Sequence, residues 1–268
     1  MSDRKHLALI KLGGSVITHK HESPPRSDRE QIQRIAYELS TCTDRLIVVL
    51  GGGAHGHQAA LKYGYGSPST DRGLLLTGLP TIRHNMTLLS LEVEQILRDA
   101  GIPAVVIPPF CIALMRNGSL ERFDTAIIHE CISAGLVPVT HGDVCFDRVR
   151  GASILSGDSI MTHLSREFLP RKVIIGTDVD GLYDKDPHLH PHAQLIPVIN
   201  RSNRSDAVRG ASSSLGSDVT GGMARKVAEL LQMSDVGCEV IVLNLTVPGR
   251  LKAALAGEMV IGTRVICD

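Results

Sequence analysis

Short apolar runs alternate with longer amphipathic segments along the chain. Runs such as Arg45–Leu50 are rich in β-branched and leucine residues, and the segments between them place apolar residues at helical spacing. Strands that alternate with helices in this way predict an α/β protein with a mainly parallel sheet. We expect strands at His6–Leu12, Arg45–Leu50, Ala104–Ile107, Leu136–Thr140, Lys172–Thr177, Glu239–Leu243 and Val260–Ile266, and helices at Asp28–Ser40 and 79–100.

Glycine turns follow several of these strands, at Gly13, Gly51, Gly142, Gly157 and Gly181. Glycine has no Cβ, so backbone N–H groups at such turns can approach an anionic ligand closely. The carboxyl ends of parallel strands are also where open α/β sheets bind ligands. The pattern therefore predicts an anion site at this edge of the sheet, with His57 at its border.

Two segments are expected to be loops because they are rich in glycine, serine and proline or in polar residues. They are 64–73 and 202–217.

Composition limits the possible partners. The chain has 268 residues, of which 43% are hydrophobic, enough for one large core or two modest ones. Lysine and arginine together number 28, as do aspartate and glutamate, so no global field favours nucleic acid or an anionic membrane. Aromatic residues make up 3% of the chain and tryptophan is absent, which argues against stacking on single-stranded nucleic acid. We expect a small-molecule partner, with neither nucleic acid nor membrane involved.

The cysteines and the apolar segments indicate a cytoplasmic protein. The six cysteines are scattered, without a C-x-x-C pair, and we expect them to be reduced. The chain start lacks the features of a signal peptide. The longest apolar region, 101–115, is interrupted by three prolines and is too short to span a bilayer.

Lysines stand beside the glycine motifs. Lys11 precedes Gly13, Lys20 follows shortly after it, and Lys226 comes just after Gly222. A compact ammonium group suits a crowded phosphoryl group better than a planar guanidinium does. Lysines away from these motifs are interpreted as solvated.

Two common phosphate motifs do not account for these residues. No G-x-x-x-x-G-K-[ST] sequence occurs in the chain. Gly51, Gly53 and Gly56 match G-x-G-x-x-G, but Asp71 lies in a loop and not at the end of a second strand, where a dinucleotide fold needs its acidic residue.

Five motifs, in order along nearly the whole chain, resemble the amino acid kinase superfamily. Among these kinases, Ile-Thr-x-Lys at 17–20, Gly-His at 56–57 and Lys-Asp-Pro at 185–187 are most similar to isopentenyl phosphate kinases. The five shared motifs are Lys-Leu-Gly-Gly-Ser at 11–15, Gly-Gly-Gly at 51–53, Ser-Gly-Asp at 156–158, Thr-Asp-Val-Asp-Gly-Leu-Tyr at 177–183 and Thr-Gly-Gly-Met-x-x-Lys at 220–226.

The resemblance implies a three-layer αβα sandwich with an open, mainly parallel central sheet. Residues 1–168 would form a lobe that binds the phosphoryl acceptor, and residues 169–268 a lobe that binds ATP, with one continuous sheet. The implied reaction transfers the γ-phosphoryl group of ATP to isopentenyl phosphate, giving isopentenyl diphosphate and ADP. Magnesium would arrive with ATP, no other metal site is expected, and related kinases are usually homodimers.

The resemblance also implies roles for individual residues. Lys20 would stabilise the transition state, and Asp158 would orient the lysines. The β- and γ-phosphates of ATP would be held by Lys11, Gly13, Gly14 and Ser15. The acceptor would be bound by Gly52, Gly53, His57 and Gly157, with Gly53 also contacting ATP. Adenosine would be surrounded by Asp178, Tyr183, Lys185 and Asp186, and Gly222 and Lys226 would close over the phosphates. The implied catalytic set is Lys11, Lys20, His57, Asp158 and Lys226.

Two positions depart from the pattern of the related kinases. His55 stands where an aromatic residue such as Phe is usual, and Gly176 where a Leu is more usual. The identity of the acceptor therefore stays open between an alkyl phosphate and a phosphonate of the fosfomycin type. The apolar segments Leu79–Leu97 and Ile112–Met115 favour an isoprenoid tail. A nucleotide sensor without turnover is a further alternative, which retention of the lysines and Asp158 disfavours.

Overall fold

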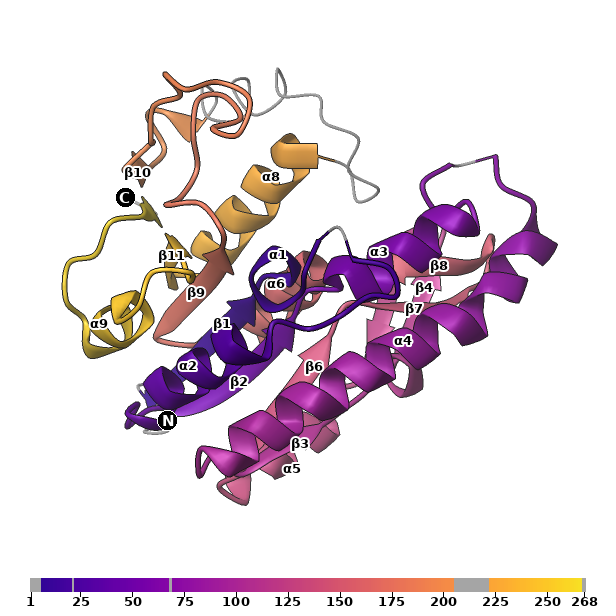
Figure 1. Ribbon diagram of the computed structural model, residues 1–268, viewed down its shortest axis with the longest axis horizontal. Helices are drawn as coiled ribbons and strands as arrows, with labels where there is room; N and C mark the ends of the chain where they lie inside the picture. Colours follow the sequence, from indigo (N-terminus) through magenta and orange to yellow (C-terminus); the bar gives the residue numbers. More distant parts are fainter. Residues whose placement is uncertain (1–5, 21, 68, 205–221, 267–268) are drawn as a thin grey trace.

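An eight-stranded sheet forms the centre of the computed structural model, which describes residues 6–20, 22–67, 69–204 and 222–266 (Figure 1). Within the described residues β11 and β12 pair antiparallel, and the other neighbours pair parallel. In spatial order the strands are β10 (Val198–Ile199), β12 (Thr263–Val265), β11 (Glu239–Asn244), β9 (Lys172–Thr177), β1 (Leu7–Leu12), β2 (Arg45–Leu50), β6 (Val137–His141) and β3 (Ala104–Val106).

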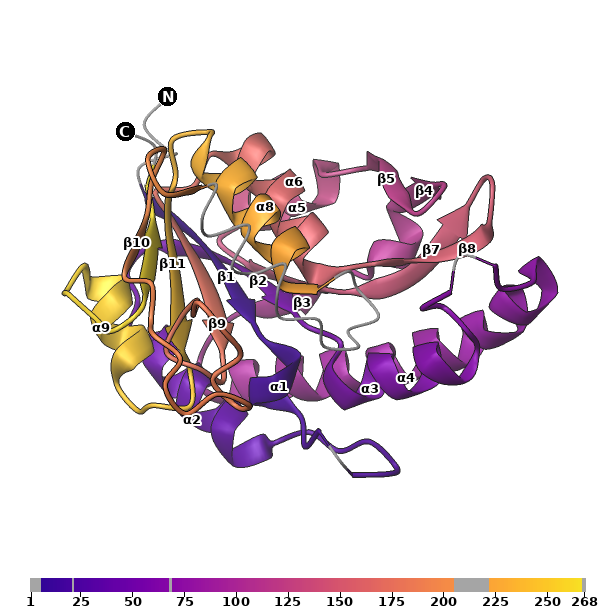
Figure 2. The same cartoon turned by 90° about the horizontal axis from the view of Figure 1, so that it is seen from above.

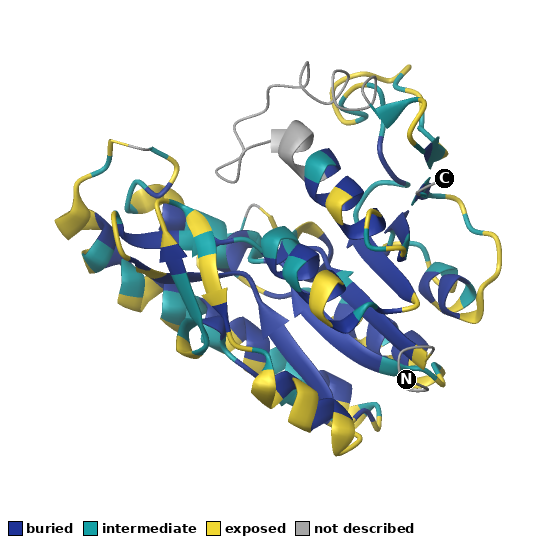
Figure 3. Cartoon of the chain, turned by 180° about the vertical axis from the view of Figure 1, so that it is seen from behind, coloured by how far each residue is buried: buried dark blue, intermediate teal, exposed yellow. Residues whose placement is uncertain are grey.

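Helices cover both faces of this sheet (Figure 2). Ile10 and Val48 belong to one apolar cluster and their neighbours Leu9 and Ile47 to the other, because successive side chains of a strand point to opposite faces. The predicted αβα sandwich is thus confirmed, and its central strands are buried (Figure 3). One layer contains α1 (Gly14–Ile17), α2 (Arg29–Ser40), α3 (Gly53–Lys62), α4 (Arg72–Asp99) and α9 (Arg250–Ala256), and the other contains α5 (Ala126–Ser133), α6 (Gly157–Phe168) and α8 (Gly222–Ser234).

Each strand expected from the apolar pattern is present, although the last is shorter than expected. The short strand β10 was not predicted, because two residues are too few to give a pattern. Of the two expected loops, 202–217 falls mostly outside the described residues. Among the described residues, none of the helices combines the length and the apolar character needed to cross a bilayer.

A second sheet of four strands was not predicted. Its order is β5 (Ser119–Phe123), β4 (Ala113–Arg116), β7 (Asp143–Asp147) and β8 (Gly151–Leu155), and the 3₁₀ turn η2 (Pro109–Cys111) precedes it. Asn117 and Gly118 join β4 to β5 with φ angles of 49° and 79°. Asn-Gly is a strong signal for such a two-residue hairpin, and it was present in the sequence. The last three residues of the segment Ile112–Met115 thus belong to β4.

The Asp147 carboxylate holds the two hairpins of the second sheet together. It accepts hydrogen bonds from the backbone N–H groups of Asn117 and Gly118, at 3.0 and 2.7 Å, and from those of Val149 and Arg150, at 2.8 and 2.9 Å. Burial opposes ionisation, but these donors outweigh it and hold the pKa of Asp147 below its usual range.

Helix α4 begins earlier than predicted. The expected helix was 79–100, whereas α4 starts at Arg72 and includes part of the expected loop. The Asp71 side chain caps it by accepting hydrogen bonds from the N–H groups of Gly73 and Leu74, at 2.8 and 3.2 Å. Pro80 lies inside the helix, within the range that was expected to be helical. The first residues of α4 were instead expected in the loop 64–73 because that segment is rich in glycine, serine and proline.

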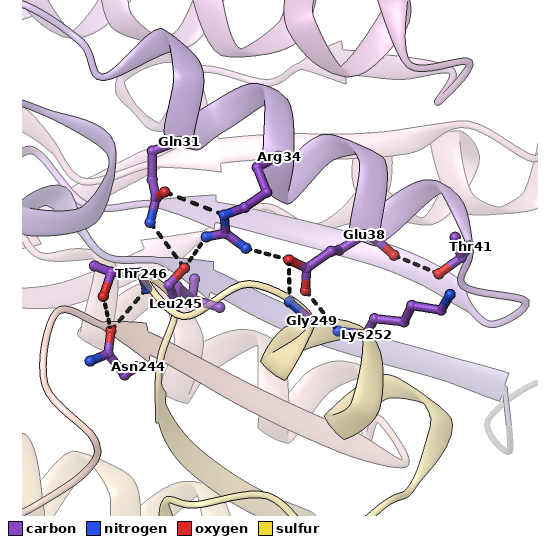
Figure 4. A network of polar contacts seen from close by, with 9 residues as sticks. All are labelled: Gln31, Arg34, Glu38, Thr41, Asn244, Leu245, Thr246, Gly249 and Lys252. Carbon is purple, nitrogen blue, oxygen red and sulfur yellow. Dashed lines mark hydrogen bonds and ion pairs between the residues drawn. The ribbon is translucent and has the colours of Figure 1, made fainter.

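Polar contacts join α2 to the C-terminal part of the sheet (Figure 4). Glu38 is buried, forms an ion pair with Arg34, and accepts hydrogen bonds from the N–H groups of Gly249 and Lys252, at 2.9 and 3.0 Å. Gln31 Nε2 donates to the Leu245 carbonyl at 3.0 Å, and Arg34 donates to the same oxygen.

Helix α9 therefore has a charge of suitable sign at each end. Glu38 meets its N-terminus, and the buried Lys172 donates to the carbonyls of Ala254 and Leu255 near its C-terminus. Acidic groups at the N-terminus and basic groups at the C-terminus both favour a helix dipole. The Leu245 N–H also donates to the Thr177 carbonyl at 2.8 Å, so these contacts fix the end of β9.

We predict that Arg34→Ala destabilises the fold, because it leaves the buried Glu38 carboxylate without its ion-pair partner. The free energy of unfolding should fall by about 3 kcal/mol in urea denaturation. Arg26→Ala is the matched control, since Arg26 pairs with Glu22 in an exposed i,i+4 pair and its removal should change stability little. Equal effects of the two substitutions would contradict this assignment.

Candidate active site

The turns that follow β1 and β2 touch backbone to backbone. A Cβ atom added to Gly14 would lie 2.2 Å from the Gly53 nitrogen, and one added to Gly51 would lie 2.5 Å from the Gly14 nitrogen. Neither position can hold a side chain without moving the other turn. The Gly51 N–H also donates to the Leu12 carbonyl at 2.8 Å. The two predicted glycine motifs thus form one continuous surface of backbone groups.

Thr18 ties these turns to α3. Its Oγ1 donates to the Gly14 carbonyl at 2.7 Å and accepts from the Ala54 N–H at 3.0 Å. Gly53 lies beside it with a φ of +49°, a conformation that favours glycine. Thr18 belongs to the Ile-Thr-x-Lys motif, but sequence reasoning gave it no role because its partners are backbone atoms.

The turn after β1 also contacts the end of β9. A Cβ atom on Gly13 would lie 2.4 Å from the carbonyl oxygen of Gly176, which is part of β9. At Gly176 itself, a Cβ atom would lie 1.9 Å from Leu245 Cδ1. The departure at Gly176 therefore has a packing reason, since the Leu245 side chain fills the space that a larger residue would need.

Lys11 and Asp158 form the charged centre of the site. Lys11 Nζ lies 2.5 Å from Asp158 Oδ1, although the two residues are 147 positions apart. Their side chains are 12% and 17% exposed, so the pair is sheltered from water yet still reachable. Asp158 lies in the first turn of α6, which begins at the Ser156 cap. This contact is compatible with the orienting role that was expected for Asp158.

Gly157 lies directly beside this pair. A Cβ atom there would be 3.5 Å from Lys11 Cε and 3.4 Å from the Leu50 carbonyl oxygen. The position therefore brings a backbone N–H of the α6 N-terminus next to the lysine. Such N–H groups favour anions.

Ser15 and Asp178 join the first glycine turn to the segment after β9. The Ser15 hydroxyl donates to Asp178 Oδ1 at 2.9 Å, and the Thr177 hydroxyl lies 3.2 Å from the same oxygen. His188 Nε2 is 3.9 Å from Asp178 Oδ2. Of the residues predicted to surround adenosine, Asp178 is thus the one tied to the phosphate turn.

The other members of that group lie further along the same segment. Tyr183 forms a β-bridge with Leu195, and Lys185 is exposed. Asp186 Oδ1 accepts a hydrogen bond from the His188 N–H at 2.9 Å, which stabilises a turn. Their contact with a nucleotide stays a prediction.

His57 lies on α3, near the helix N-terminus that starts at Gly53, and it is partly exposed. The positive end of the helix dipole and the side chain of His57 therefore lie on the same short helix. Gly52, the residue before α3, contributes to the same N-terminus.

His55 has a different environment from His57. It is 6% exposed, and its carbonyl accepts a hydrogen bond from Asn85 Nδ2 at 3.2 Å. Burial lowers its pKa, against a smaller opposing effect of Glu92. A buried, neutral imidazole packs as an aromatic ring does, which accounts for this departure from the related kinases.

The roles of two further lysines, Lys20 and Lys226, stay predictions. Lys20 is exposed in the loop between the bridge partners Thr18 and Ser27. That loop lies against α3, because Gln58 Nε2 donates to the Glu22 carbonyl at 2.7 Å. Gly222 begins α8, but the side chain of Lys226 lies outside the described residues.

Within the described part of the chain, no three His, Cys, Asp or Glu side chains cluster as a metal site would require. His188, His190 and His192 therefore do not gather other potential ligands around them. The cysteines of this part are all free.

The arrangement suits the joining of two anions. It combines a lysine held by a carboxylate, backbone N–H groups of touching turns and two helix N-termini. Phosphoryl transfer needs mainly alignment and neutralisation of charge, and these groups supply both.

Comparison with known proteins agrees with the family resemblance of the sequence motifs. Residues 6–244 match the amino acid kinase family. The chain is 37% identical to isopentenyl phosphate kinase of Methanothermobacter thermautotrophicus, over 97% of this chain and 98% of that protein. It is 34% identical to isopentenyl phosphate kinase of Thermoplasma acidophilum, over 96% and 99% of the two chains.

Solved structures agree with the sequence matches. An X-ray structure of isopentenyl phosphate kinase superposes with a TM-score of 0.84 at 35% identity, covering 97% of this chain and 100% of the other. A substrate complex of isopentenyl phosphate kinase gives a TM-score of 0.79 at 28% identity, over 97% and 99%. The chain therefore belongs to the amino acid kinase family and, within it, to the isopentenyl phosphate kinases.

Proposed function

We propose that this protein transfers the γ-phosphoryl group of ATP to isopentenyl phosphate, giving isopentenyl diphosphate and ADP. The observation that carries the proposal is the Lys11–Asp158 pair at the touching glycine turns, in a chain 37% identical to an isopentenyl phosphate kinase. An oxygen of the acceptor phosphate attacks the γ-phosphorus, and the bond to the oxygen shared with the β-phosphate breaks. ADP leaves with that oxygen.

The acceptor needs no dedicated general base. The second pKa of a phosphate monoester is about 6, so its attacking oxygen is already ionised at neutral pH. The protein instead has to bring two anions into line. Positive charge and backbone N–H groups at the meeting point supply that stabilisation.

On the nucleotide side, Lys11, Gly13, Gly14 and Ser15 hold the β- and γ-phosphates. Asp158 keeps the Lys11 ammonium group in place through their 2.5 Å contact. The adenosine lies along the segment that includes Asp178, Tyr183, Lys185 and Asp186. Gly222 and Lys226 close over the phosphates from α8.

On the acceptor side, His57 binds the monophosphate, and Gly52, Gly53 and Gly157 offer backbone N–H groups. Lys20 reaches the transferring group in the transition state. Residues 1–168 thus form the acceptor lobe and also supply the turn that holds the ATP phosphates, and residues 169–268 form the lobe that binds the rest of ATP.

Magnesium and a second subunit complete the proposal. Mg²⁺ is usually held by nucleotide phosphates and by only one or two protein carboxylates. Among the described residues, Asp158 and Asp178 could supply such carboxylate ligands. When bound with ATP, the ion neutralises charge on the β- and γ-phosphates. We also infer a cytoplasmic location, and a homodimer as the resemblance to related kinases implies.

A coupled assay of ADP release tests the proposal. Isopentenyl phosphate should support turnover well above the rate with ATP alone, and dimethylallyl phosphate and fosfomycin serve as competing acceptors. Faster turnover with fosfomycin than with isopentenyl phosphate would replace the proposed acceptor by a phosphonate. Binding of ATP without turnover of any acceptor would indicate a nucleotide sensor.

His57→Ala should lower kcat/KM for isopentenyl phosphate by about 10- to 100-fold, which corresponds to one charge-assisted hydrogen bond. The KM for ATP should stay within about twofold. His55→Phe is the matched control on the same helix, because a buried ring is retained there, and it should keep its acceptor kinetics. Unchanged kinetics in His57→Ala would exclude His57 from the acceptor site.

Lys20→Ala should lower kcat by about 100-fold and change either KM much less, because its ammonium group is assigned to the transition state. Steady-state kinetics with each substrate varied in turn measure the difference. Lys62→Ala, at the exposed end of α3, is the control and should behave as the wild type. A rise in KM with unchanged kcat would assign Lys20 to ground-state binding.

A further inference from the structure

One turn of α4 contacts the helix that carries His57. Met86 Sδ lies 3.7 Å from the place where a Cβ atom of Gly52 would stand, and 3.2 Å from the corresponding place at Gly56. Asn85 Nδ2 donates to the His55 carbonyl at 3.2 Å. This turn of α4 therefore fixes the start of α3.

Through Arg83, the same turn of α4 also contacts β7, on the side of the proposed acceptor site opposite α3. Arg83 forms an ion pair with Asp143, the first residue of β7. The Asp143 side chain is fully buried and that of Arg83 is 19% exposed. The Arg83 guanidinium carbon also lies 5.0 Å from the centre of the Phe110 ring, which limits its freedom to swing away.

Asp143 is closely linked to Gly157. It pairs with Leu155 across the β7–β8 hairpin, and Leu155 leads through Ser156 into Gly157. The preceding residue, Gly142, donates its N–H to the Leu50 carbonyl at 2.9 Å. A Cβ atom on Gly142 would lie 3.1 Å from the Gly157 nitrogen. Displacement of Asp143 would therefore move the Gly157 N–H and the adjacent Asp158.

An ion pair this deeply buried is not explained by stability alone. Desolvation of two charges cancels much of their attraction, and an apolar pair of similar volume often stabilises a fold equally well. The charged pair does, however, fix the direction and length of the link between α4 and β7, because a guanidinium and a carboxylate bond only in defined geometries.

We propose that Arg83 and Asp143 are positioning residues for the acceptor, whose ion pair sets the distance between the His57 helix and the Gly157 N–H. The inference rests on the proposed function and names residues that act on the acceptor through other groups. In this proposal Arg83 and Asp143 neither transfer protons nor touch the transferring phosphoryl group.

Of the titratable groups described near Asp143, Arg83 is the one that is charged near pH 7. His141 Nδ1, on β6, lies 3.7 Å from Asp143 Oδ2, but burial lowers the pKa of His141 to about 4, so it is neutral near pH 7. Burial also raises the pKa of the nearby Cys145 thiol, with Asp143 adding to the shift. Burial raises the pKa of Asp143 itself to about 7, against the opposing effect of Arg83. The ion pair is therefore about half formed near pH 7, approaches completion as the pH rises above it and weakens as the pH falls.

Asp143→Asn tests the inference, because asparagine keeps the volume and can still accept the hydrogen bond from Val144. The KM for isopentenyl phosphate should rise roughly tenfold, since a small misplacement at a reacting centre is costly, while the KM for ATP changes less than about twofold. The wild type should lose kcat/KM for the acceptor as the pH falls through about 7. In Asp143→Asn this loss of kcat/KM should be absent, so that only the ionisation of the acceptor phosphate itself still changes kcat/KM at acid pH.

Glu38→Gln is the matched control, because it alters another buried carboxylate of an arginine ion pair away from the acceptor. It should lower the melting temperature and leave the KM for isopentenyl phosphate unchanged. If Asp143→Asn does not fold, Arg83→Gln is measured in its place. An unchanged acceptor KM, or equal rises for acceptor and ATP, would overturn the inference.

Calorimetry of isopentenyl phosphate binding separates this result from the proposed function. A wild type that binds the acceptor without turnover would contradict the proposed reaction, and the loss of affinity in Asp143→Asn would still report on positioning. A wild type that binds no isopentenyl phosphate would overturn both.

Discussion

The close contact between backbone turns at the carboxyl edge of the central sheet is the constraint on which the site depends. Gly14 and Gly53 stand where a single methyl group would force the turns after β1 and β2 apart, and Gly13 has the same relation to Gly176. Glycine at these positions brings rows of N–H groups from three neighbouring strands to one small region. A phosphate chain can be held across such a region because no side chain stands between it and the backbone. Glycine loses more chain entropy on folding than other residues, and the apolar side chains of the strands beneath, which are buried, oppose this cost.

Few charged side chains of the described residues lie beside this backbone surface, and Lys11 and Asp158 form the central pair. Lys11 extends from β1 and is held by Asp158 at the start of α6, so its ammonium group is positioned before any anion arrives. Preorganised charge of this kind costs no reorganisation during the reaction. The buried His55 adds no charge, because its pKa is lowered, and its place on α3 leaves His57 as the partly exposed histidine of that helix.

The sequence could predict the parts of the site that depend on local pattern. The apolar runs located the strands, and the glycines that follow them located the edge where Lys11, Ser15, Asp158 and Asp178 come together. The start of α4 and the second sheet were missed for different reasons. The start of α4 depends on the Asp71 cap, which lies in a segment whose glycine, serine and proline predicted a loop, whereas the Asn117-Gly118 hairpin signal was present and was not used. Thr18 and the Arg83–Asp143 pair could not be found in this way, because their roles depend on partners distant in sequence or on backbone atoms.

The fold contains two buried arginine–carboxylate pairs, and they differ in how firmly the carboxylate is held. Glu38 accepts backbone N–H groups from Gly249 and Lys252 as well as its arginine, so its negative charge is shared among several donors and serves the end of β9. Asp143 has Arg83 and a single N–H, from Val144, and burial raises its pKa to about 7. The link that spaces the acceptor side is therefore the more easily weakened of the two. Because burial raises the pKa of Asp143 and Arg83 offsets this only in part, this ion pair makes the acceptor side of the site sensitive to pH.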